Sequence, residues 1–374
     1  MIQKNLISWF KKEQRALPWR ETYDPYQVWI SEIMLQQTQV ATVLPYFERF
    51  MKALPTLSAL AEADENTLLK LWEGLGYYSR AHNLQKAARI VLNEHGGVFP
   101  DSYEAILTLP GIGPYTAGAI CSIAYNQDRP IVDGNIVRVI SRLDDFREEV
   151  KGNMPYFWKR AEELLPKGDA RLFNQGLMEL GALVCTPKSP RCSVCPLNEF
   201  CKARAIGSAE DLPNKGPSRS KIKVRVAIAI LEKDGKIFVQ KRRDSGLMAG
   251  LWEFPGGKVE KKESFEAALH REVLEETGFQ IQNPRFFMNL QHAYTRYVVD
   301  LHCYTAEVSD GMLALTAATE ARWVKPEELK AMPFPAANVK IIDRYLEIQA
   351  NQALPSQRDD SIPQMENHGS KAQD

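Results

Sequence analysis

The sequence predicts a multidomain protein of the α and α+β class, with an all-α domain in residues 1–206 and an α+β domain in residues 222–350. Up to about residue 205, apolar residues recur every three or four positions, which is typical of amphipathic helices. From residue 222 the pattern changes to β-type runs around one helical stretch. Residues 207–221 are rich in Gly, Pro, Ser and charge, so we expect a flexible linker between the domains.

Length and composition agree with this organisation. The chain has 374 residues, of which 44% are apolar, and this is enough for two or three packed cores. Lys and Arg number 47, as do Asp and Glu, so the net charge is zero and a polybasic nucleic-acid binder is excluded. The opening residues contain no apolar stretch of signal-peptide length, and no later stretch reaches the ~18 apolar residues of a membrane span. We therefore expect a cytoplasmic protein without membrane contact, and a disordered polar tail at 351–374.

The cysteines are concentrated near the end of the α domain, where four of the six occur at Cys185, Cys192, Cys195 and Cys201. Their C-x6-C-x2-C-x5-C spacing predicts a metal site, because six cysteines in so long a chain do not make a disulfide scaffold. Zinc is one reading, but zinc sites more often use two C-x2-C pairs, and the wide first gap favours an iron–sulfur cluster. Cys121 and Cys303 are isolated, so we expect them in the cores.

The segment LPGIGPYTAG, upstream of the cysteines, carries a second motif. Gly111 and Gly113 allow a tight turn between two helices, and backbone N–H groups at the start of the second helix can then approach a phosphate oxygen. This is the outline of a helix-hairpin-helix element. A simple turn is the alternative, but the position of the segment before the cysteines favours the DNA-binding reading.

Two carboxylates stand out in the α domain. Glu32 lies in YQVWISEIMLQQTQV, where its neighbours one helical turn away are apolar, so its side chain projects from an apolar stripe. Burial raises the pKa of a carboxyl group and suits it to general-acid chemistry, whereas the alternative is a carboxylate paired with backbone or Arg groups. Asp133, in PIVDGNIVRVISRL, has the strong alternative of a helix N-cap. Spacing alone does not choose between these readings.

Five longer stretches of the α domain are informative together: WISEIMLQQTQVATVLPYFERF, LWEGLGYYSRAHNL, LPGIGPYTAGAI, VDGNIVRVISRL and NQGLMELGALVC. With the cysteine loop that follows them, they resemble the MutY-type adenine DNA glycosylases of the endonuclease III superfamily. The resemblance implies a helix-hairpin-helix glycosylase fold, a [4Fe-4S] cluster on the four cysteines, and double-stranded DNA as partner. It also implies a monomer in the cytoplasm, associated with the nucleoid.

The resemblance assigns roles to individual residues. Glu32 would protonate adenine and Asp133 would stabilise the sugar cation, while Tyr115 and Asn135 would belong to the same pocket. This division of labour is chemically coherent, because adenine leaves poorly as an anion while positive charge develops on the sugar. Tyr115 stands where related glycosylase-lyases carry a Schiff-base lysine, which implies a monofunctional enzyme.

Further residues are expected to touch DNA. In the α domain the resemblance implies Arg20, Gln37, Thr38, Leu75, Tyr77, Gly111 and Gly113. Of these, Gln37, Leu75 and Tyr77 match family residues that wedge into the duplex beside the lesion and hold it open, with helix packing as the alternative for Leu75. In the second domain, Gly250 in GLWEFPGG matches a family glycine that lies against the DNA backbone. The lesion reader of the family, HxFSH, stands here as HAYTR. Because a stacking ring and a hydroxyl are kept, we expect 8-oxoguanine to be read by His292, Tyr294 and Thr295.

The second domain also carries the complete Nudix signature, in GGKVEKKESFEAALHREVLEETGF. We therefore expect a Nudix fold, with helices on both faces of a sheet. Glu272, Glu275 and Glu276 share one helix face, where three carboxylates repel unless a cation such as Mg²⁺ neutralises them. The alternative is a solvated acidic face with an Arg271–Glu275 pair. Asn338, in PFPAANVKII, resembles the segment by which MutT-type 8-oxo-dGTP hydrolases grip oxidised guanine.

These features predict a base-excision repair enzyme that hydrolyses the N-glycosidic bond of adenine mispaired with 8-oxoguanine or guanine. Two alternatives stay open. One is a dual enzyme that also hydrolyses 8-oxo-dGTP through the Nudix segment, and the other is an iron–sulfur redox or regulatory DNA-binding protein. A pure binder has no need of an unpaired acid on an apolar stripe, which speaks against the second alternative.

Overall fold

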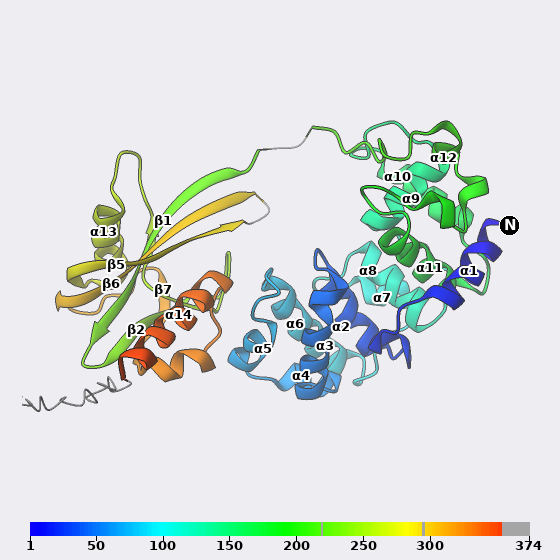
Figure 1. Ribbon diagram of the computed structural model, residues 1–374. Coiled ribbons are helices and arrows are strands. Elements are labelled where there is room, and N and C mark those ends of the chain that lie inside the picture. Colours follow the sequence, from blue (N-terminus) through cyan, green and yellow to red (C-terminus); the bar gives the residue numbers. More distant parts are fainter. Residues whose placement is uncertain (218–219, 294–295, 354–374) are drawn as a thin grey trace, which may run out of the picture.

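The computed structural model describes residues 1–217, 220–293 and 296–353, and it confirms the α and α+β class (Figure 1). The first part of the chain is helical, with short 3₁₀ turns between the helices and a π-helical turn at Ile120–Ala124. Its helices are α1 (Ile2–Glu13), α2 (Pro25–Leu35), α3 (Val40–Ala53), α4 (Leu57–Glu62), α5 (Glu65–Trp72), α6 (Ser79–Glu94), α7 (Tyr103–Leu107), α8 (Pro114–Ala119), α9 (Gly134–Asp144), α10 (Met154–Leu164), α11 (Ala170–Leu183) and α12 (Lys202–Ile206).

These helices pack into two hydrophobic cores. The first lies among α2–α8 and includes the buried Trp72, and the second lies among α1, α9, α10 and α11 and includes Phe157. Helix α2 contributes to both, since Val28 packs in the second core and Trp29 in the first. A helix buried on all sides is expected to be apolar all round. Glu32 is the one acidic residue of α2, and it is an exception to this expectation because it lies in a helix that packs in both cores.

The hairpin motif joins α7 to α8. Gly111 has a φ of +79°, and an added Cβ would lie 2.7 Å from the Cβ of Asn83 on α6, so both the backbone conformation and the close approach require glycine. Gly113 is the N-cap of α8, and an added Cβ there would meet open space. The hairpin therefore packs against α6 at Gly111, while the N-terminus of α8 at Gly113 has free space beside it.

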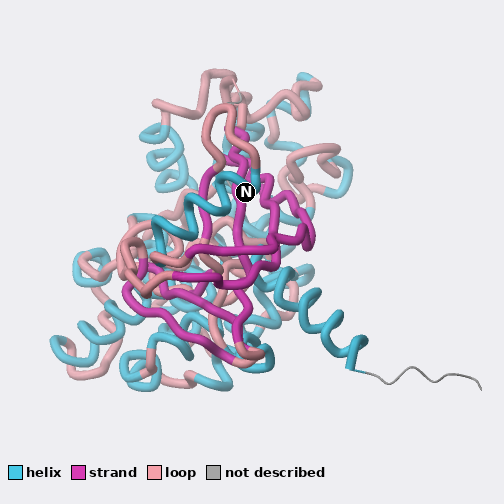
Figure 2. The backbone as a smooth tube through the Cα atoms, turned by 90° about the vertical axis from the view of Figure 1, so that its left-hand side faces the viewer, coloured by secondary structure: helices cyan, strands magenta, loops and turns pink. Residues whose placement is uncertain are grey.

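The second part of the chain is a mixed sheet with a helix on each face. Its elements are β1 (Ile222–Lys233), β2 (Lys236–Arg242), β3 (Trp252–Glu253), β4 (Gly256–Lys258), α13 (Phe265–Thr277), β5 (Gln280–Ala293), β6 (Tyr297–Asp310), β7 (Ala318–Val324) and α14 (Ala336–Ala353). The strand order is β3-β2-β1-β6-β5, with β4 on β1 and β7 on β2. Figure 2 shows these strands as one group in magenta.

Among the described residues, one strand pair of this sheet is parallel. β1 runs parallel to β6, from Ile222 opposite Tyr297 to Glu232 opposite Glu307, and the other pairs are antiparallel. Asp234, with a φ of +51°, begins the two-residue turn between β1 and β2. One apolar core lies under α14 and another under α13, as the Nudix signature predicts.

The segment predicted as a flexible linker is held in part against the α domain. Val150 donates its N–H to the carbonyl of Asn214 at 2.9 Å, and Arg142 donates to the carbonyl of Leu212 at 3.1 Å. Composition did not reveal this, because the acceptors are backbone groups that any residue carries.

Within the described residues, none of the helices has both the length and the apolar character that crossing a bilayer requires.

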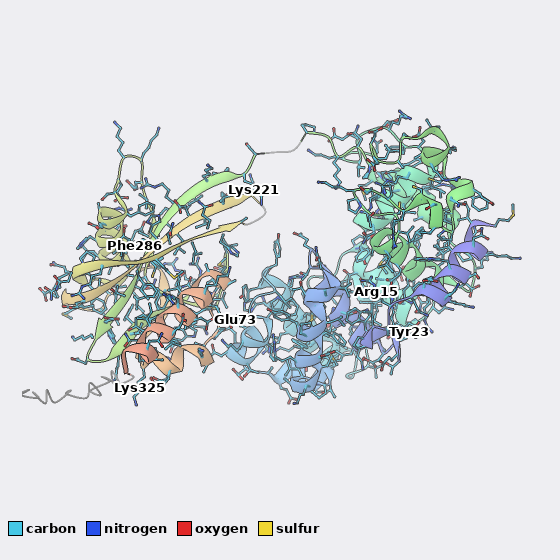
Figure 3. All side chains as sticks on the ribbon, in the orientation of Figure 1. Arg15, Tyr23, Glu73, Lys221, Phe286 and Lys325 are labelled. Atoms are coloured by element: carbon cyan, nitrogen blue, oxygen red, sulfur yellow. The ribbon has the colours of Figure 1, made fainter. Side chains whose placement is uncertain are left out.

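The two domains touch along α5 and α6. Lys241 of β2 pairs with Glu65 of α5 at 2.7 Å, and the side chain of Leu251 is buried in the first helical core. Glu73 accepts the backbone N–H of Phe334 at 2.8 Å. Figure 3 labels Glu73 on the side of the α domain that faces the sheet domain.

Candidate functional site

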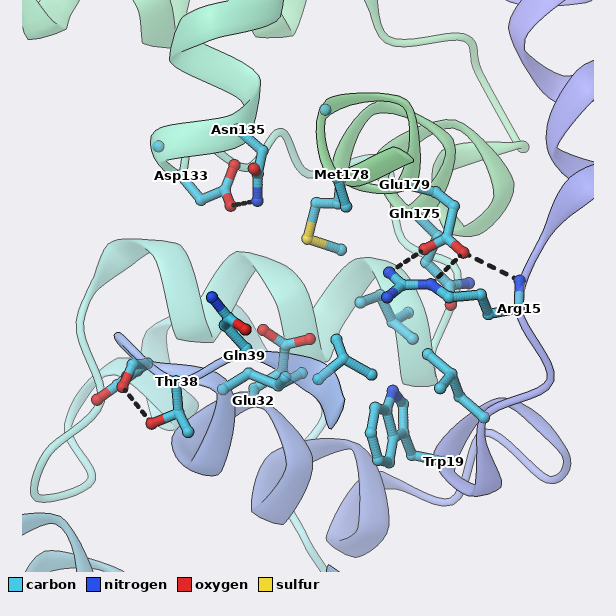
Figure 4. Close-up of a pocket in the computed structure, with 18 of the residues that line it drawn as sticks. Arg15, Trp19, Glu32, Thr38, Gln39, Asp133, Asn135, Gln175, Met178 and Glu179 are labelled. Carbon is cyan, nitrogen blue, oxygen red and sulfur yellow. Dashed lines mark hydrogen bonds and ion pairs between the residues drawn. The ribbon is translucent and has the colours of Figure 1, made fainter. Parts of the chain in front are cut away.

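A pocket of about 820 Å³ opens between α2, α8, α9 and α11, at the boundary of the two helical cores (Figure 4). Such a volume is ample for a nucleobase and its sugar. The pocket brings together seven of the predicted site residues from distant parts of the chain: Arg20, Glu32, Gln37, Thr38, Tyr115, Asp133 and Asn135. Of the other predicted residues in the α domain, Leu75, Tyr77, Gly111 and Gly113 are not among its lining residues.

Glu32 enters the pocket from α2, and its side chain is 4% exposed. Burial raises the pKa of Glu32 to about 7, the charge of Asp133 acts in the same direction, and Arg20 acts against it. The Tyr115 hydroxyl donates to Oε2 of Glu32 at 2.8 Å, which also favours the ionised form. A carboxyl group with this pKa is protonated in about half of the molecules near neutral pH, as a general acid requires.

Asp133 combines the two roles that the sequence left open. It is the N-cap of α9, where its Oδ1 accepts the backbone N–H of Ile136 at 2.7 Å, and its Oδ2 accepts the amide N–H of Asn135 at 2.8 Å. Burial raises the pKa of Asp133, and both hydrogen bonds act against this by favouring the ionised carboxylate. The cap therefore holds a negative group at the pocket wall that also acts electrostatically on Glu32.

A buried charge cluster beside Glu32 was not found from the sequence. Glu179 of α11 is 1% exposed and accepts from Arg15 at 2.8 Å and from Arg20 at 2.9 Å. These bonds hold the pKa of Glu179 near 2, despite its burial. Gln175, one turn earlier on α11, accepts from Arg20 at 3.0 Å. Glu179 thus keeps Arg20 in place and offsets cationic charge that would otherwise lower the pKa of Glu32.

The pocket is connected to the cysteine segment by hydrogen bonds. Arg138 of α9 donates to Oδ1 of Asn135 at 2.8 Å and to the carbonyl of Cys185 at 2.7 Å. One turn later, Arg142 donates to Sγ of Cys185 at 3.3 Å. Both arginines lie in the VDGNIVRVISRL stretch, at a four-residue spacing that places them on one helix face.

The cysteine segment brings its four cysteines together around one small pocket, as a shared metal centre requires. The four cysteines line one small pocket together with three arginines, and none of the cysteines forms a disulfide. A zinc site needs four sulfurs about 2.3 Å from a common centre. Among the described residues, no three His, Cys, Asp or Glu side chains are arranged to hold one metal ion in this way. Burial and the neighbouring thiols raise the pKa of Cys195 to about 11, so this thiol needs bound metal in order to ionise.

The predicted DNA-contacting residues differ in how they are presented. Gln37 and Tyr77 are exposed, Tyr77 to 48%, and both have a positive φ, +59° and +46°. Leu75 is 6% exposed and packs in the first helical core, so the packing alternative describes its position here. The hydroxyl of Thr38 donates to the carbonyl of Gln36 at 3.4 Å, within the same segment as Gln37.

In the second domain, Gly250 lies against the α domain. Its φ is +73°, and an added Cβ would come within 3.0 Å of Oε1 of Glu65 on α5. His292 is near the end of β5, where burial and the charge of Lys340 lower its pKa. Tyr294 and Thr295, the other two predicted lesion readers, lie outside the described residues.

The acidic residues of the Nudix helix α13 divide into two groups. Glu275 is largely exposed and pairs with Arg271 at 3.2 Å. This pair is the one expected if the acidic face of the helix is solvated. Glu276 is turned inward, where burial and the charges of Glu253 and Glu272 raise its pKa to about 7, while the N–H of Gly256 and the Gln240 amide act against them. Glu253, on β3, was not found from the sequence because it lies outside the Nudix signature.

Three family models match the chain in the order of these parts. Residues 30–160 match the HhH-GPD superfamily of base excision DNA repair proteins, residues 185–201 match the iron–sulfur binding domain of endonuclease III, and residues 226–344 match the NUDIX domain. With the helical fold and the pocket that holds Glu32 and Asp133, these matches define a DNA glycosylase with an iron–sulfur loop and a Nudix domain.

Curated relatives narrow this class. The chain is 34% identical over 422 residues to an adenine DNA glycosylase of Mus musculus, covering 97% of this chain and 81% of the relative. It is 39% identical over 257 residues to the adenine DNA glycosylase of Buchnera aphidicola subsp. Baizongia pistaciae, covering 68% and 73%. A thermostable thymine-DNA glycosylase structure superposes with a TM-score of 0.50 at 32% identity, covering 54% of this chain and 94% of that one. The chain belongs to the adenine DNA glycosylase family, as the resemblance implied, and is a DNA-binding hydrolase of base excision repair.

Proposed function

We propose that this enzyme removes adenine mispaired with 8-oxoguanine or guanine in double-stranded DNA, by hydrolysis of the N-glycosidic bond. The observation that carries the proposal is the buried Glu32, whose pKa is raised to about 7 in a pocket that also holds Asp133. Burial raises the pKa of both carboxyl groups, but they differ in how many hydrogen bonds favour their ionised form. Glu32 lies between apolar cores, and Asp133 accepts two hydrogen bonds at a helix N-terminus.

The two groups divide the chemistry between them. The bond between adenine and the sugar breaks with its electron pair moving to the base, and the Glu32 carboxyl group gives its proton to an adenine nitrogen. Positive charge develops on the sugar, where the Asp133 carboxylate stabilises it. Water then adds to the sugar carbon and loses a proton, which leaves free adenine and an abasic site. All of these groups come from one chain, so we infer that the enzyme acts as a monomer.

The same pocket supports monofunctional chemistry. A glycosylase-lyase needs an amine to form a Schiff base with the sugar. No lysine is among the described residues that line the pocket, and at the position expected for one the hydroxyl of Tyr115 is engaged with Glu32. The enzyme is therefore expected to leave the DNA strand intact after removing the base.

We assign the reading of the opposite base to the sheet domain, through His292, Tyr294 and Thr295. The domain contacts α5 through Glu65 and the turn after α5 through Glu73 and Tyr78, and the exposed Tyr77 lies in the same turn. Excision rates on duplexes with adenine opposite 8-oxoguanine and opposite guanine test this assignment. His292→Ala should lower the ratio of the two rates more than it lowers excision opposite guanine.

The proposed chemistry is tested with Glu32→Gln. This change keeps the hydrogen bond from Tyr115 but removes the proton donor, and it should slow single-turnover excision by ~100-fold or more while duplex binding is retained. The exposed Glu94→Gln serves as control and should behave like wild type. Excision by Glu32→Gln at the wild-type rate would refute the role of Glu32, and strand cleavage by wild type without added base would refute the monofunctional mechanism.

A second activity is favoured by the inward carboxylates of the sheet domain. Burial and the charges of Glu253 and Glu272 raise the pKa of Glu276, while Glu253 also pairs with Arg242 and Glu272 with Arg271. Gly257 allows close approach, since an added Cβ would lie 2.3 Å from Oε2 of Glu272. The oxygens of these glutamates are of the kind that Mg²⁺ prefers. Among the described residues, no three acidic side chains are arranged to hold a metal ion, so Mg²⁺ binding would require these glutamates to move closer together. When bound, Mg²⁺ would supply charge neutralisation for a nucleoside triphosphate and an activated water. We therefore propose hydrolysis of 8-oxo-dGTP, with Asn338 near the base.

Release of 8-oxo-dGMP in the presence of Mg²⁺ measures this second activity. Glu276→Gln should abolish it, while Glu266→Gln, an exposed position on the same helix, should leave it unchanged. No release by wild type, or equal release by wild type and Glu276→Gln, would show that the Nudix segment is a scaffold.

A further inference from the structure

Arg80, on α6, is a buried cation without a carboxylate partner among the ion pairs of the described residues. Its residue exposure is 9%, and burial lowers its pKa to about 10. An unpaired buried charge is costly, and its hydrogen bonds are what makes the position tolerable. The two terminal nitrogens donate to five backbone carbonyls, those of Ile33 (2.8 Å), Met34 (3.2 Å), Gln36 (2.7 Å), Leu75 (3.1 Å) and Gly76 (3.2 Å).

These carbonyls belong to two separate parts of the chain. One nitrogen of Arg80 holds the end of α2 and Gln36, where the helix leaves carbonyls without intrahelical partners. The other nitrogen holds the turn between α5 and α6. The next residue after each held segment, Gln37 and Tyr77, is exposed and has a positive φ. Arg80 therefore joins the two segments that carry the exposed residues proposed to enter DNA.

The guanidinium group of Arg80 also lies over two aromatic rings. The central carbon of Arg80 lies 5.3 Å from the ring centroid of Trp72, which is buried, and 5.6 Å from that of Tyr77, which is half exposed. A cation over a ring face is attracted to it, so the same group that holds the backbone also holds the exposed ring of Tyr77.

We propose that Arg80 is a positioning residue for adenine extrusion, because it joins the Gln36–Gln37 segment and the Leu75–Tyr77 turn into one rigid wedge. The proposal rests on the proposed function, since it concerns how the base reaches the pocket. Taking a base out of the stack costs a few kcal/mol, and a wedge ordered in advance avoids the further entropic cost of ordering two loops. Lysine cannot replace this arrangement, because its single ammonium group lacks the planar fork that reaches both segments.

The test compares two duplexes that differ only in how easily the adenine leaves the stack. In one, adenine opposite 8-oxoguanine is flanked by matched pairs, and in the other by two mismatched pairs on each side. Excision is measured in a single turnover with saturating enzyme for wild type, Arg80→Lys and Arg80→Met. Arg89→Met is the matched control, because Arg89 also lies on α6 and also donates to a carbonyl, that of Ala61 at 2.9 Å, away from both segments.

Arg80→Lys should slow excision from the matched duplex about 10-fold or more, and from the mismatched duplex far less, since extrusion is already inexpensive there. Arg89→Met should not change the ratio of the two rates. Equal slowing on both duplexes, or no slowing on either, would overturn the proposal. If Arg80→Met does not fold, the lysine variant still carries the test.

A second readout does not depend on bond cleavage. A fluorescent adenine analogue at the target position brightens when it leaves the stack, so enzyme binding reports extrusion directly. Arg80→Lys should reduce this signal on the matched duplex at saturating enzyme, and an unreduced signal would overturn the proposal. If wild type brightens the analogue but cleaves neither duplex, the proposed function fails while the positioning role of Arg80 stands.

Discussion

At the residue scale, the burial of Glu32 provides a carboxyl group with a raised pKa but lowers the stability of the folded protein at neutral pH. Glu32 is placed between two apolar cores with one hydrogen bond, from Tyr115, and its pKa is raised to about 7. In the unfolded chain the same group has an ordinary pKa near 4.5. The folded protein therefore binds a proton more tightly than the unfolded chain, and raising the pH costs stability.

This difference predicts that Glu32→Gln stabilises the protein in a pH-dependent way. Below pH 4.5 the carboxyl is protonated in both states and the variant gains nothing. The gain grows between pH 4.5 and 7 and is complete by pH 8, where it should reach up to about 3 kcal/mol, the free energy equivalent of the pKa shift. Urea unfolding at pH 5, 6.5 and 8 measures it. Equal stability of the two proteins at pH 8 would mean that burial does not oppose ionisation of Glu32.

At the element scale, α9 depends on Asp133 for its N-cap, and the pocket uses the same carboxylate. Asparagine caps a helix about as well as aspartate but carries no charge. Asp133→Asn should therefore keep the unfolding free energy within about 0.5 kcal/mol of wild type and lose excision. Asp133→Ala should lose both, with a stability cost of about 1 kcal/mol. A large destabilisation of the asparagine variant would favour a purely structural role.

The cysteine segment contacts the second helical core through the buried Leu197, but its two short helical turns lie outside the buried part of that core. Its 3₁₀ turns at Cys192–Val194 and Asn198–Phe200 contain no buried residues. Binding of a cluster is therefore expected to supply much of its folding free energy. Cys195→Ser should lose the visible iron–sulfur absorption and bind duplex DNA more weakly, because exposed basic residues such as Lys188 lie on this segment. Metal analysis that finds zinc without iron in wild type would contradict the cluster.

At the scale of the whole molecule, the helical domain and the sheet domain meet at the turn that carries Tyr77. Glu73, at the start of that turn, accepts the N–H of Phe334 and pairs with Lys70, which donates to the carbonyl of Met332 at 3.1 Å. The hydroxyl of Tyr78 donates to the carbonyl of Phe334 at 3.3 Å. Contacts from both domains thus converge on one short segment.

Loosening this contact should affect lesion preference more than excision itself. Glu73→Ala removes a partly buried acceptor, which corresponds to a loss of roughly 1 kcal/mol in docking and about a 5-fold smaller rate ratio between adenine opposite 8-oxoguanine and opposite guanine. Glu62→Ala, exposed on α4, is the control. Equal loss of rate on both duplexes would show that the contact supports the fold and not the reading of the lesion.

The sequence by itself determined the features that depend on local pattern. Apolar spacing predicted the helical part and the later sheet because a helix or strand buries one face at a regular interval. The N-cap alternative for Asp133 could be predicted because a cap is formed with a residue three positions away. The cysteine spacing likewise predicted a metal site, since its ligands lie within one short segment.

Tertiary structure alone decided the features that depend on residues far apart in the chain. Glu179 pairs with Arg15, which is 164 positions away, and Arg80 donates to the carbonyl of Ile33, which is 47 positions away. No local sequence pattern predicts such contacts. The burial of Leu75, which the sequence left between packing and DNA contact, was decided by the core around it. The reason is common to all three: the pKa of a carboxyl group, the cost of a buried cation and the exposure of an apolar side chain depend on which groups surround it in space.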